Sequence, residues 1–251
     1  MSAYGYELAE DGAAVLGLIV LQSDETIERD FRRMFTSDVP IHVSRVPSEA
    51  EVTPETLQQM AGHLTAAASL FPPPIDFAAV GYGCTSGTAQ IGAARIAELV
   101  QAGTRTAAVT DPLTALVAAC GALGVTRLAF LSPYVESVSA RLRGALEAQG
   151  IASPVFGSFD EPSEAKVVRI SRGSIEAAAA DLAGQGGAEA VFLSCTNLRT
   201  LDVIETIENR TGLPCLSSNQ VLAWHMARLA GVAVDVPGRL GRAGGGERHV
   251  A

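Results

Sequence analysis

Two cysteines in this sequence are placed where a thiol could do chemistry. The sequence reads YGCTSG around Cys84 and LSCTNL around Cys195, and a threonine follows each cysteine. Each pair comes after a short apolar run and before an amphipathic stretch, which predicts a turn from a strand into a helix. The helix dipole and the free N–H groups of such a turn favour an anion, so we expect them to lower the thiol pKa. Two such turns facing each other would place one thiol on each face of a small carboxylic acid, as a two-base racemase requires.

The residues beside these cysteines have the hydroxyl and N–H groups that bind carboxylates. We expect Thr85, Ser86 and Thr196 to hold a substrate carboxylate, or the enolate-like oxygens that form when its α-carbon loses a proton. Tyr134, in LSPYVES, follows a predicted strand and is either a pocket residue or a surface tyrosine. Asp24 follows the run VLGLIVL, where an acid often lies in the first turn of a helix.

The other cysteines and the histidines indicate a structural role. Cys120 lies in VAACGAL and Cys215 in LPCLS, where a free cysteine usually packs as a small apolar residue. His225 lies on an apolar helix, where a packed, hydrogen-bonded histidine is expected. No pair of cysteines has C-x-x-C spacing and the four histidines lie in unrelated segments, so we expect free thiols and no metal site.

Apolar runs and amphipathic stretches alternate along the whole chain, which is typical of an α/β protein with parallel sheets. The predicted strands are 15–21, 41–46, 77–81, 106–110, 127–131, 152–156, 190–193 and 214–217. The predicted helices are about 25–35, 54–69, 88–102, 113–122, 135–149, 173–184, 200–210 and 218–230.

The repeated Cys-Thr turn predicts two similar lobes. We expect an N-terminal lobe over 13–110, a C-terminal lobe over 111–217, and a helix at 218–231 that packs back on the first lobe. Ligands of open α/β sheets bind at the carboxyl ends of the strands, which is where both cysteines fall. The segment 236–251 is rich in Gly and Arg without periodicity, so we expect a disordered tail.

The composition narrows the class of protein. The chain has 251 residues, of which 48% are hydrophobic, so it can bury a sizeable core. Its net charge of -9 argues against nucleic acid and anionic membranes as partners. Lys166 is the single lysine and has no supporting motif, which argues against pyridoxal-phosphate chemistry. Apolar runs are short and residues 1–11 are acidic without a basic region, so we expect a cytoplasmic protein.

Five segments carry a resemblance to a known family: GLIVLQSDETIE (17–28), VGYGCTSGT (80–88), LSPY (131–134), LSCTNLRTLDVI (193–204) and LPCLSSNQVLAWHMARLAG (213–231). They are similar to the aspartate/glutamate racemase superfamily, and within it to the branch of maleate cis-trans isomerases and arylmalonate decarboxylases. The segments LQSDET and YGCTSGT look most like those of the ectoine-utilisation protein A group.

This resemblance implies two pseudo-symmetric α/β lobes, an active site between them, and no metal or organic cofactor. Racemases of the superfamily exchange a proton with two cysteines, and maleate isomerases add one cysteine to the double bond. Arylmalonate decarboxylases keep only the second cysteine. Because this chain has both Cys84 and Cys195, the resemblance favours isomerisation or racemisation over decarboxylation.

The resemblance also implies roles for single residues. Cys84 would be the base or nucleophile of the first lobe, and Cys195 the acid or base of the second. The substrate carboxylate would be bound by Thr85, Ser86, Tyr134 and the backbone around Thr196.

Asp24 departs from the isomerase pattern, which has an asparagine there. A carboxylate at this position repels the second carboxylate of maleate and attracts an ammonium group. The region 160–168 shows no clear counterpart of a second substrate-binding asparagine. An amino acid or diamino acid is therefore the more plausible substrate.

The leading hypothesis is a cofactor-independent isomerase or racemase whose partner is a small carboxylate substrate. The alternatives are a cysteine-dependent decarboxylase of malonate-type acids and a carboxylate-binding pathway protein without turnover. The sequence leaves a homo-oligomer open.

Overall fold

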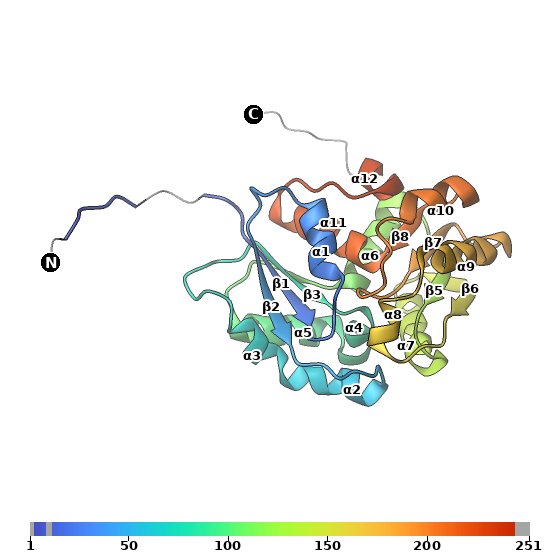
Figure 1. The fold of residues 1–251 in the computed structure, drawn as a ribbon, viewed down its shortest axis with the longest axis horizontal. Helices are drawn as coiled ribbons and strands as arrows, with labels where there is room; N and C mark the ends of the chain where they lie inside the picture. The colour runs from blue at the N-terminus through green and yellow to red at the C-terminus, as the bar shows by residue number, and fades with distance from the viewer. Residues whose placement is uncertain (1–2, 9–11, 244–251) are drawn as a thin grey trace.

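Two parallel sheets form the framework of the computed structural model, which describes residues 3–8 and 12–243 (Figure 1). The first sheet has the order β2-β1-β3-β4, and its strands are β1 (Leu16–Leu21), β2 (Ile41–Val46), β3 (Ala79–Gly83) and β4 (Val109–Thr110). The second sheet has the order β6-β5-β7-β8, and its strands are β5 (Arg127–Ser132), β6 (Ala152–Ser158), β7 (Ala190–Leu193) and β8 (Cys215–Ser217). All paired strands are parallel, which confirms the predicted α/β class.

Helices connect the strands and flank both sheets (Figure 1). Those of the first half are α1 (Ile27–Met34), α2 (Pro54–Gln59), the 3-10 turn η1 (Met60–Gly62), α3 (Leu64–Ala68), α4 (Thr85–Ile91), α5 (Ala93–Gly103) and α6 (Pro112–Leu123). Those of the second half are α7 (Glu136–Glu147), α8 (Glu164–Val167), α9 (Arg172–Gly184), α10 (Ile204–Thr211), α11 (Ser218–Ala230) and α12 (Gly238–Ala243).

Two predicted helices are divided in the structure. The stretch 54–69 contains α2, η1 and α3 in succession. The stretch 88–102 starts earlier than expected, at Thr85, and breaks at Gly92, whose φ of 93° is incompatible with a continuous helix. The break separates the short α4, which begins directly after Cys84, from α5.

Two helices join the halves of the molecule. α6 follows the last strand of the first sheet and packs against α11, which follows the last strand of the second sheet. α11 also packs against β3 and α1, so the helix that leaves the second sheet covers the first one (Figure 1). The central strands β1, β3 and β7 are buried along their whole length, as expected for strands covered on both faces.

The predicted disorder is wrong for residues 236–243, because this segment is packed and ends in the helix α12. The side chains of Val236 and Leu240 are buried, and the Glu208 carboxylate accepts the backbone N–H of Arg239 at 2.9 Å. Gly238 has a φ of 76°, and a Cβ at this position would lie 2.8 Å from a Glu208 oxygen. The Gly-rich sequence therefore serves a close contact here, while residues 244–251 lie outside the described residues.

Within the described part of the chain, no helix has the length and apolar character needed to cross a membrane.

Candidate active site

Cys84 lies at the carboxyl end of β3 and is the N-cap residue of α4. Its Sγ accepts the backbone N–H of Gly87 at 3.1 Å, and its side chain is 4% exposed. A Cβ on Gly87 would lie 2.6 Å from the Tyr82 hydroxyl and 2.9 Å from the Cys84 Sγ. A glycine is thus required for the helix to start this close to the thiol.

Cys195 follows β7 but does not begin a helix. It has a φ of 106°, which L-residues rarely adopt, and α10 starts only at Ile204. The Sγ accepts the backbone N–H of Asn197 at 3.2 Å, and the Cys195 N–H donates to the Ser218 Oγ at 3.0 Å. The helix predicted at about 200–210 begins at Ile204, so the expected helix dipole acts at Cys84 and not at Cys195.

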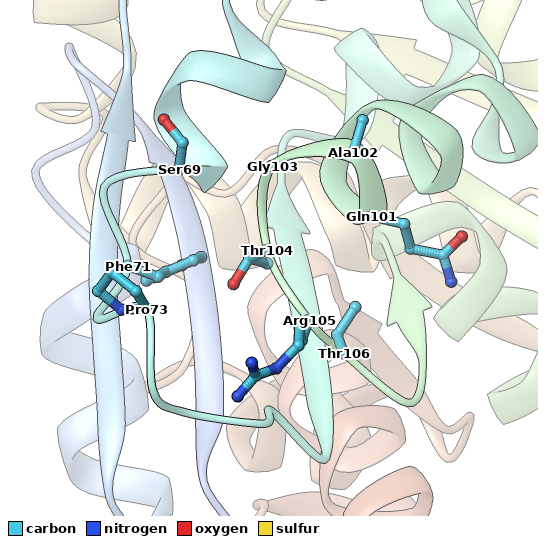
Figure 2. Close-up of a pocket in the computed structure, with 9 residues that line it drawn as sticks. All are labelled: Ser69, Phe71, Pro73, Gln101, Ala102, Gly103, Thr104, Arg105 and Thr106. Atoms are coloured by element: carbon cyan, nitrogen blue, oxygen red, sulfur yellow. The ribbon is translucent and has the colours of Figure 1, made fainter.

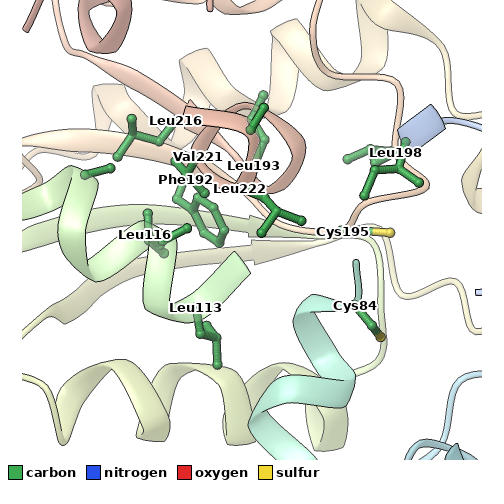
Figure 3. Packing of buried hydrophobic residues seen from close by; sticks show 14 of the residues in the cluster. Cys84, Leu113, Leu116, Phe192, Leu193, Cys195, Leu198, Leu216, Val221 and Leu222 are labelled. Carbon is green, nitrogen blue, oxygen red and sulfur yellow. The ribbon is translucent and has the colours of Figure 1, made fainter. Parts of the chain in front are cut away.

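The two cysteine turns contact each other. The hydroxyl of Thr196 donates to the carbonyl of Gly83 at 3.2 Å, and the hydroxyl of Thr85 donates to the Ser218 Oγ at 2.8 Å. Ser218 therefore accepts hydrogen bonds from both turns. Figure 3 shows Cys84 and Cys195 on these neighbouring segments, which brings the two predicted thiols into one site.

Asn219 and Asp30 form hydrogen bonds that hold the backbone of the second cysteine turn. The Asn219 Nδ2 donates to the Thr196 carbonyl at 2.8 Å and to the Asp30 Oδ2 at 2.9 Å. Burial raises the pKa of Asp30 to about 6. Asn219 thus holds the backbone of the turn.

The two carboxylate oxygens of Asp24 have different surroundings. Its Oδ1 accepts the N–H groups of Thr26 at 2.7 Å and Ile27 at 2.8 Å, where α1 begins. Its Oδ2 is buried and accepts no hydrogen bond of normal geometry among the described residues, although the Thr196 hydroxyl is close enough to lower the pKa of the carboxyl. Burial raises the pKa of Asp24, against the effect of the two N–H donors.

The hydroxyls expected to bind a carboxylate are differently engaged. The Ser86 Oγ is buried and has no partner in the part of the chain that the structure describes. The hydroxyls of Thr85 and Thr196 already donate between the turns. Tyr134 is buried, and its oxygen lies 2.9 Å from the Cys195 Sγ. Ser86 is therefore the predicted hydroxyl that lacks a partner, and the Ser194 Oγ next to Cys195 also lacks one among the described residues.

Glu164 is a site residue that sequence reasoning missed. It lies on the one-turn helix α8, is buried, and accepts the Tyr134 hydroxyl on Oε1 at 2.6 Å and the Asn197 Nδ2 on Oε2 at 2.7 Å. Burial raises the pKa of Glu164, and the carboxylate of Asp24 raises it further. The surrounding sequence EPSEAK reads as an exposed loop, so no local signal marks this residue. The region without a predicted asparagine supplies an acid instead.

Both thiols have a raised pKa, contrary to expectation. Burial raises the pKa of Cys84 to about 12, although the Gly87 N–H opposes this. Burial also raises the pKa of Cys195, and the Glu164 carboxylate raises it further. The loss of water around the thiols and the nearby acids outweigh the N–H donors of the turns.

The remaining candidates are packed away from the site. Cys120 and Cys215 are buried, and His225 Nδ1 lies 2.8 Å from the Thr110 hydroxyl, as expected for structural residues. No cluster of three or more His, Cys, Asp or Glu side chains suited to a metal ion occurs within residues 3–8 and 12–243.

A cavity of 520 Å³ lies away from the cysteines (Figure 2). It is lined by Phe71 and Pro73, which precede β3, and by Gly103 to Thr106, which precede β4. The cavity therefore opens at the amino ends of these strands, whereas Cys84 follows a carboxyl end, where α/β proteins bind their ligands.

Comparison with known proteins gives the family. The sequence profile described as arylmalonate decarboxylase matches residues 92–242, which is more than half of the chain. The chain belongs to the arylmalonate decarboxylase family.

Two curated relatives are an arylmalonate decarboxylase of Bordetella bronchiseptica and a maleate isomerase of Nocardia farcinica. The first is 28% identical over 49% of this chain and 51% of its own length, and the second is 28% identical over 57% of each. The matched regions thus span about half of each relative.

Solved structures of the same family share the fold over nearly the whole chain. The maleate isomerase of Pseudomonas putida S16, in a variant with maleate, has a TM-score of 0.81 at 21% identity and covers 92% of this chain and 98% of that one. The Nocardia farcinica maleate isomerase, in a cysteine-to-serine variant with a covalently bound succinylcysteine intermediate, has a TM-score of 0.79 at 24% identity, with coverages of 92% and 99%. These relatives share the two flanked parallel sheets of this chain.

Proposed function

We propose that this family member is a cofactor-independent isomerase or racemase of a small carboxylic acid that carries an ammonium group. The observation that carries the proposal is a pair of thiols on contacting turns, beside a buried donor and a buried acceptor that lack hydrogen-bond partners among the described residues. The donor is the Ser86 hydroxyl and the acceptor is the Asp24 Oδ2. A zwitterionic amino acid has the complementary groups, a carboxylate for Ser86 and an ammonium for Asp24.

The substrate carboxylate is expected at the start of α4. There the Ser86 hydroxyl and the free N–H groups of the first helical turn favour negative charge, including the charge that builds up on the carboxylate oxygens when the α-carbon is deprotonated. The thiolate of one cysteine removes the α-proton from one face. The thiol of the other cysteine delivers its proton to the opposite face, and the two cysteines exchange protonation states.

The acids of the site argue against a dicarboxylate as substrate. Asp24 and Glu164 are both buried, and neither forms an ion pair within the described residues. A second substrate carboxylate would lie near these two acids in a buried site, where repulsion between like charges is strong. An ammonium group on the substrate would instead be attracted to these acids. The segments LQSDET and YGCTSGT, which resemble ectoine-utilisation protein A, support an amino acid from ectoine breakdown as the substrate.

Decarboxylation of a malonate-type acid is the second candidate, and it is favoured by the family profile and by the Bordetella bronchiseptica relative. Such a reaction needs one thiol to protonate the carbanion left by carbon dioxide. It would leave the buried Cys84 without a role.

The experiment is incubation in deuterated water with amino and diamino acids, maleate and an arylmalonate, followed by proton NMR and chiral chromatography. We expect α-deuteration and racemisation of an amino acid. Cys84→Ala and Cys195→Ala should each abolish racemisation, although either variant can still exchange the α-proton of one enantiomer. Cys120→Ala, which removes a buried thiol remote from both turns, is the matched control and should retain activity.

Two outcomes would overturn the proposal. Full activity of Cys84→Ala together with an inactive Cys195→Ala would indicate a one-cysteine, decarboxylase-like reaction. Efficient turnover of maleate that Asp24→Asn leaves unchanged would show that Asp24 does not select the charge of the substrate.

A further inference from the structure

A continuous hydrogen-bond chain links the second cysteine to a carboxylate. The Tyr134 oxygen lies 2.9 Å from the Cys195 Sγ, and the Tyr134 hydroxyl donates to the Glu164 Oε1 at 2.6 Å. All three side chains are buried. Each bond is short enough for a proton to move along it.

Asn197 fixes both ends of this chain. Its side-chain Nδ2 donates to the Glu164 Oε2 at 2.7 Å, and its backbone N–H donates to the Cys195 Sγ at 3.2 Å. A negative charge on either the carboxylate or the sulfur therefore finds a donor. The arrangement stabilises the charge at both places that it can occupy.

Cys84 has no comparable connection. Its Sγ accepts the N–H of Gly87 and lies close enough to the Tyr82 hydroxyl for that group to lower its pKa, but Tyr82 continues to the Met60 Sδ at 3.7 Å and not to a carboxylate. No hydrogen bond within the described residues links Cys84 to a carboxylate through a side chain. The two thiols, alike in burial, differ in their access to a base.

We propose that Glu164, acting through Tyr134, accepts the proton of Cys195, so that Cys195 begins the reaction as the thiolate and Cys84 as the thiol. The S–H bond of Cys195 breaks and its proton goes to the Tyr134 oxygen, while the Tyr134 O–H bond breaks and its proton goes to Glu164 Oε1. The electron pair stays on sulfur, and the net charge of the three groups does not change. This inference rests on the proposed two-thiol function and makes Glu164 a positioning residue for it.

The neutral exchange explains how a thiol with a raised pKa can ionise. Releasing the proton to solvent would leave a new charge beside Asp24 and Glu164, which burial penalises. Passing it to Glu164 moves an existing negative charge from oxygen to sulfur instead. The buried acid is thereby the source of the thiolate.

The test compares alkylation of the two cysteines in the same molecule. Iodoacetamide is applied near neutral pH, and peptide mass spectrometry gives the rate at Cys195 relative to Cys84. Because both thiols are buried to a similar extent on contacting turns and react in the same sample, a change in their ratio between wild type and variant reports thiolate content. We expect Cys195 to react faster in the wild type, and Glu164→Gln and Tyr134→Phe to lower the ratio at least about tenfold, which corresponds to about one pKa unit.

The sign of the change separates a relay from simple repulsion. If Glu164 only repels the thiolate, Glu164→Gln removes that repulsion and the ratio rises, which would overturn the proposal. An unchanged ratio, or faster reaction of Cys84 in the wild type, would overturn it as well. Glu161→Gln, in the same segment but paired with Lys166 at 3.3 Å, is the matched control and should leave the ratio unchanged. Circular dichroism checks the folding of each variant, and Tyr134→Phe keeps the test decisive if Glu164→Gln does not fold.

This readout is independent of turnover. A lowered ratio in a protein that racemises nothing would support the relay and contradict the proposed function. Racemisation that requires both cysteines, together with an alkylation ratio that Glu164→Gln leaves unchanged, would support the proposed function and contradict the relay.

Discussion

The backbone at Cys195 differs from that at Cys84 in a way that costs free energy. Cys195 has a φ of 106°, whereas Cys84 has a φ of -149°, which is ordinary extended backbone. A non-glycine residue in such a conformation costs about 1–3 kcal/mol and persists only where its surroundings hold it. The hydrogen bonds from the Asn197 N–H and to Ser218 hold it here. They direct the Sγ of Cys195 towards Tyr134.

This strain predicts opposite responses to glycine at Cys195 and at Cys120. Cys195→Gly should be more stable than Cys195→Ala by about 1 kcal/mol, because glycine adopts a positive φ without strain. Cys120 lies inside the helix α6, and Cys120→Gly should be less stable than Cys120→Ala by about 0.5–1 kcal/mol, because glycine in a helix interior loses more backbone entropy. Urea denaturation of the four variants measures both differences. The same order at both positions would mean that the conformation of Cys195 is not strained.

The two candidate thiols and their neighbours could be proposed from the sequence, because the repeated Cys-Thr pairs are local motifs. Sequence reasoning missed Glu164, whose burial depends on contacts with Tyr134 and Asn197, 30 and 33 residues away in the chain. It also predicted the wrong direction for the thiol pKa values. Helix N–H groups are visible in a sequence pattern, but the degree of burial that opposes them arises only from the packed lobes.

At the scale of elements, the C-terminal segment shows where pattern reasoning fails. The strands 41–46 and 190–193 have the bounds that the sequence predicts, since Pro40 and Pro47 flank the alternating IHVSRV and the apolar run AVFL ends at Ser194. The segment VPGRLGRA has only two large apolar residues, Val236 and Leu240, so no periodicity reveals the helix α12. Its position depends on Glu208, which accepts the N–H of Arg239 and also that of Cys215 at 3.0 Å.

We therefore expect α12 to contribute to stability. Leu240 is 0% exposed, and Leu240→Ala should lower the free energy of unfolding by about 2–5 kcal/mol through loss of buried surface and a remaining cavity. Leu70, which is 75% exposed, gives the control: Leu70→Ala should change it by no more than about 0.5 kcal/mol. Urea denaturation followed by circular dichroism measures both. Equal stability of the two variants would show that α12 does not hold to the body of the protein.

At the scale of the whole molecule, the exchange of helices couples the two sheets. α11 leaves the second sheet and packs on β3 of the first, and α6 leaves the first sheet and packs on α11. Ser218, the first residue of α11, accepts hydrogen bonds from Thr85 and Cys195. Because α11 packs against elements of both halves, unfolding of one sheet removes the contacts that α11 makes there and destabilises the other sheet.

This coupling predicts one cooperative unfolding transition. Trp224 is the single tryptophan and is buried on α11, so its fluorescence reports the junction of the two sheets. Its urea transition should coincide with that of far-ultraviolet circular dichroism, which reports all helices and strands. Two separated transitions would mean that the lobes unfold independently.

The burial of the two thiols has a kinetic consequence. Cys84 is 4% exposed and Cys195 is 3% exposed, so a dissolved acid meets neither sulfur by collision with the surface. Substrate binding at the two sulfurs therefore requires the protein to open and then close around the substrate. The arrival of substrate is then governed by the frequency of a conformational event, and at high substrate concentration its rate reaches a ceiling that belongs to the protein alone.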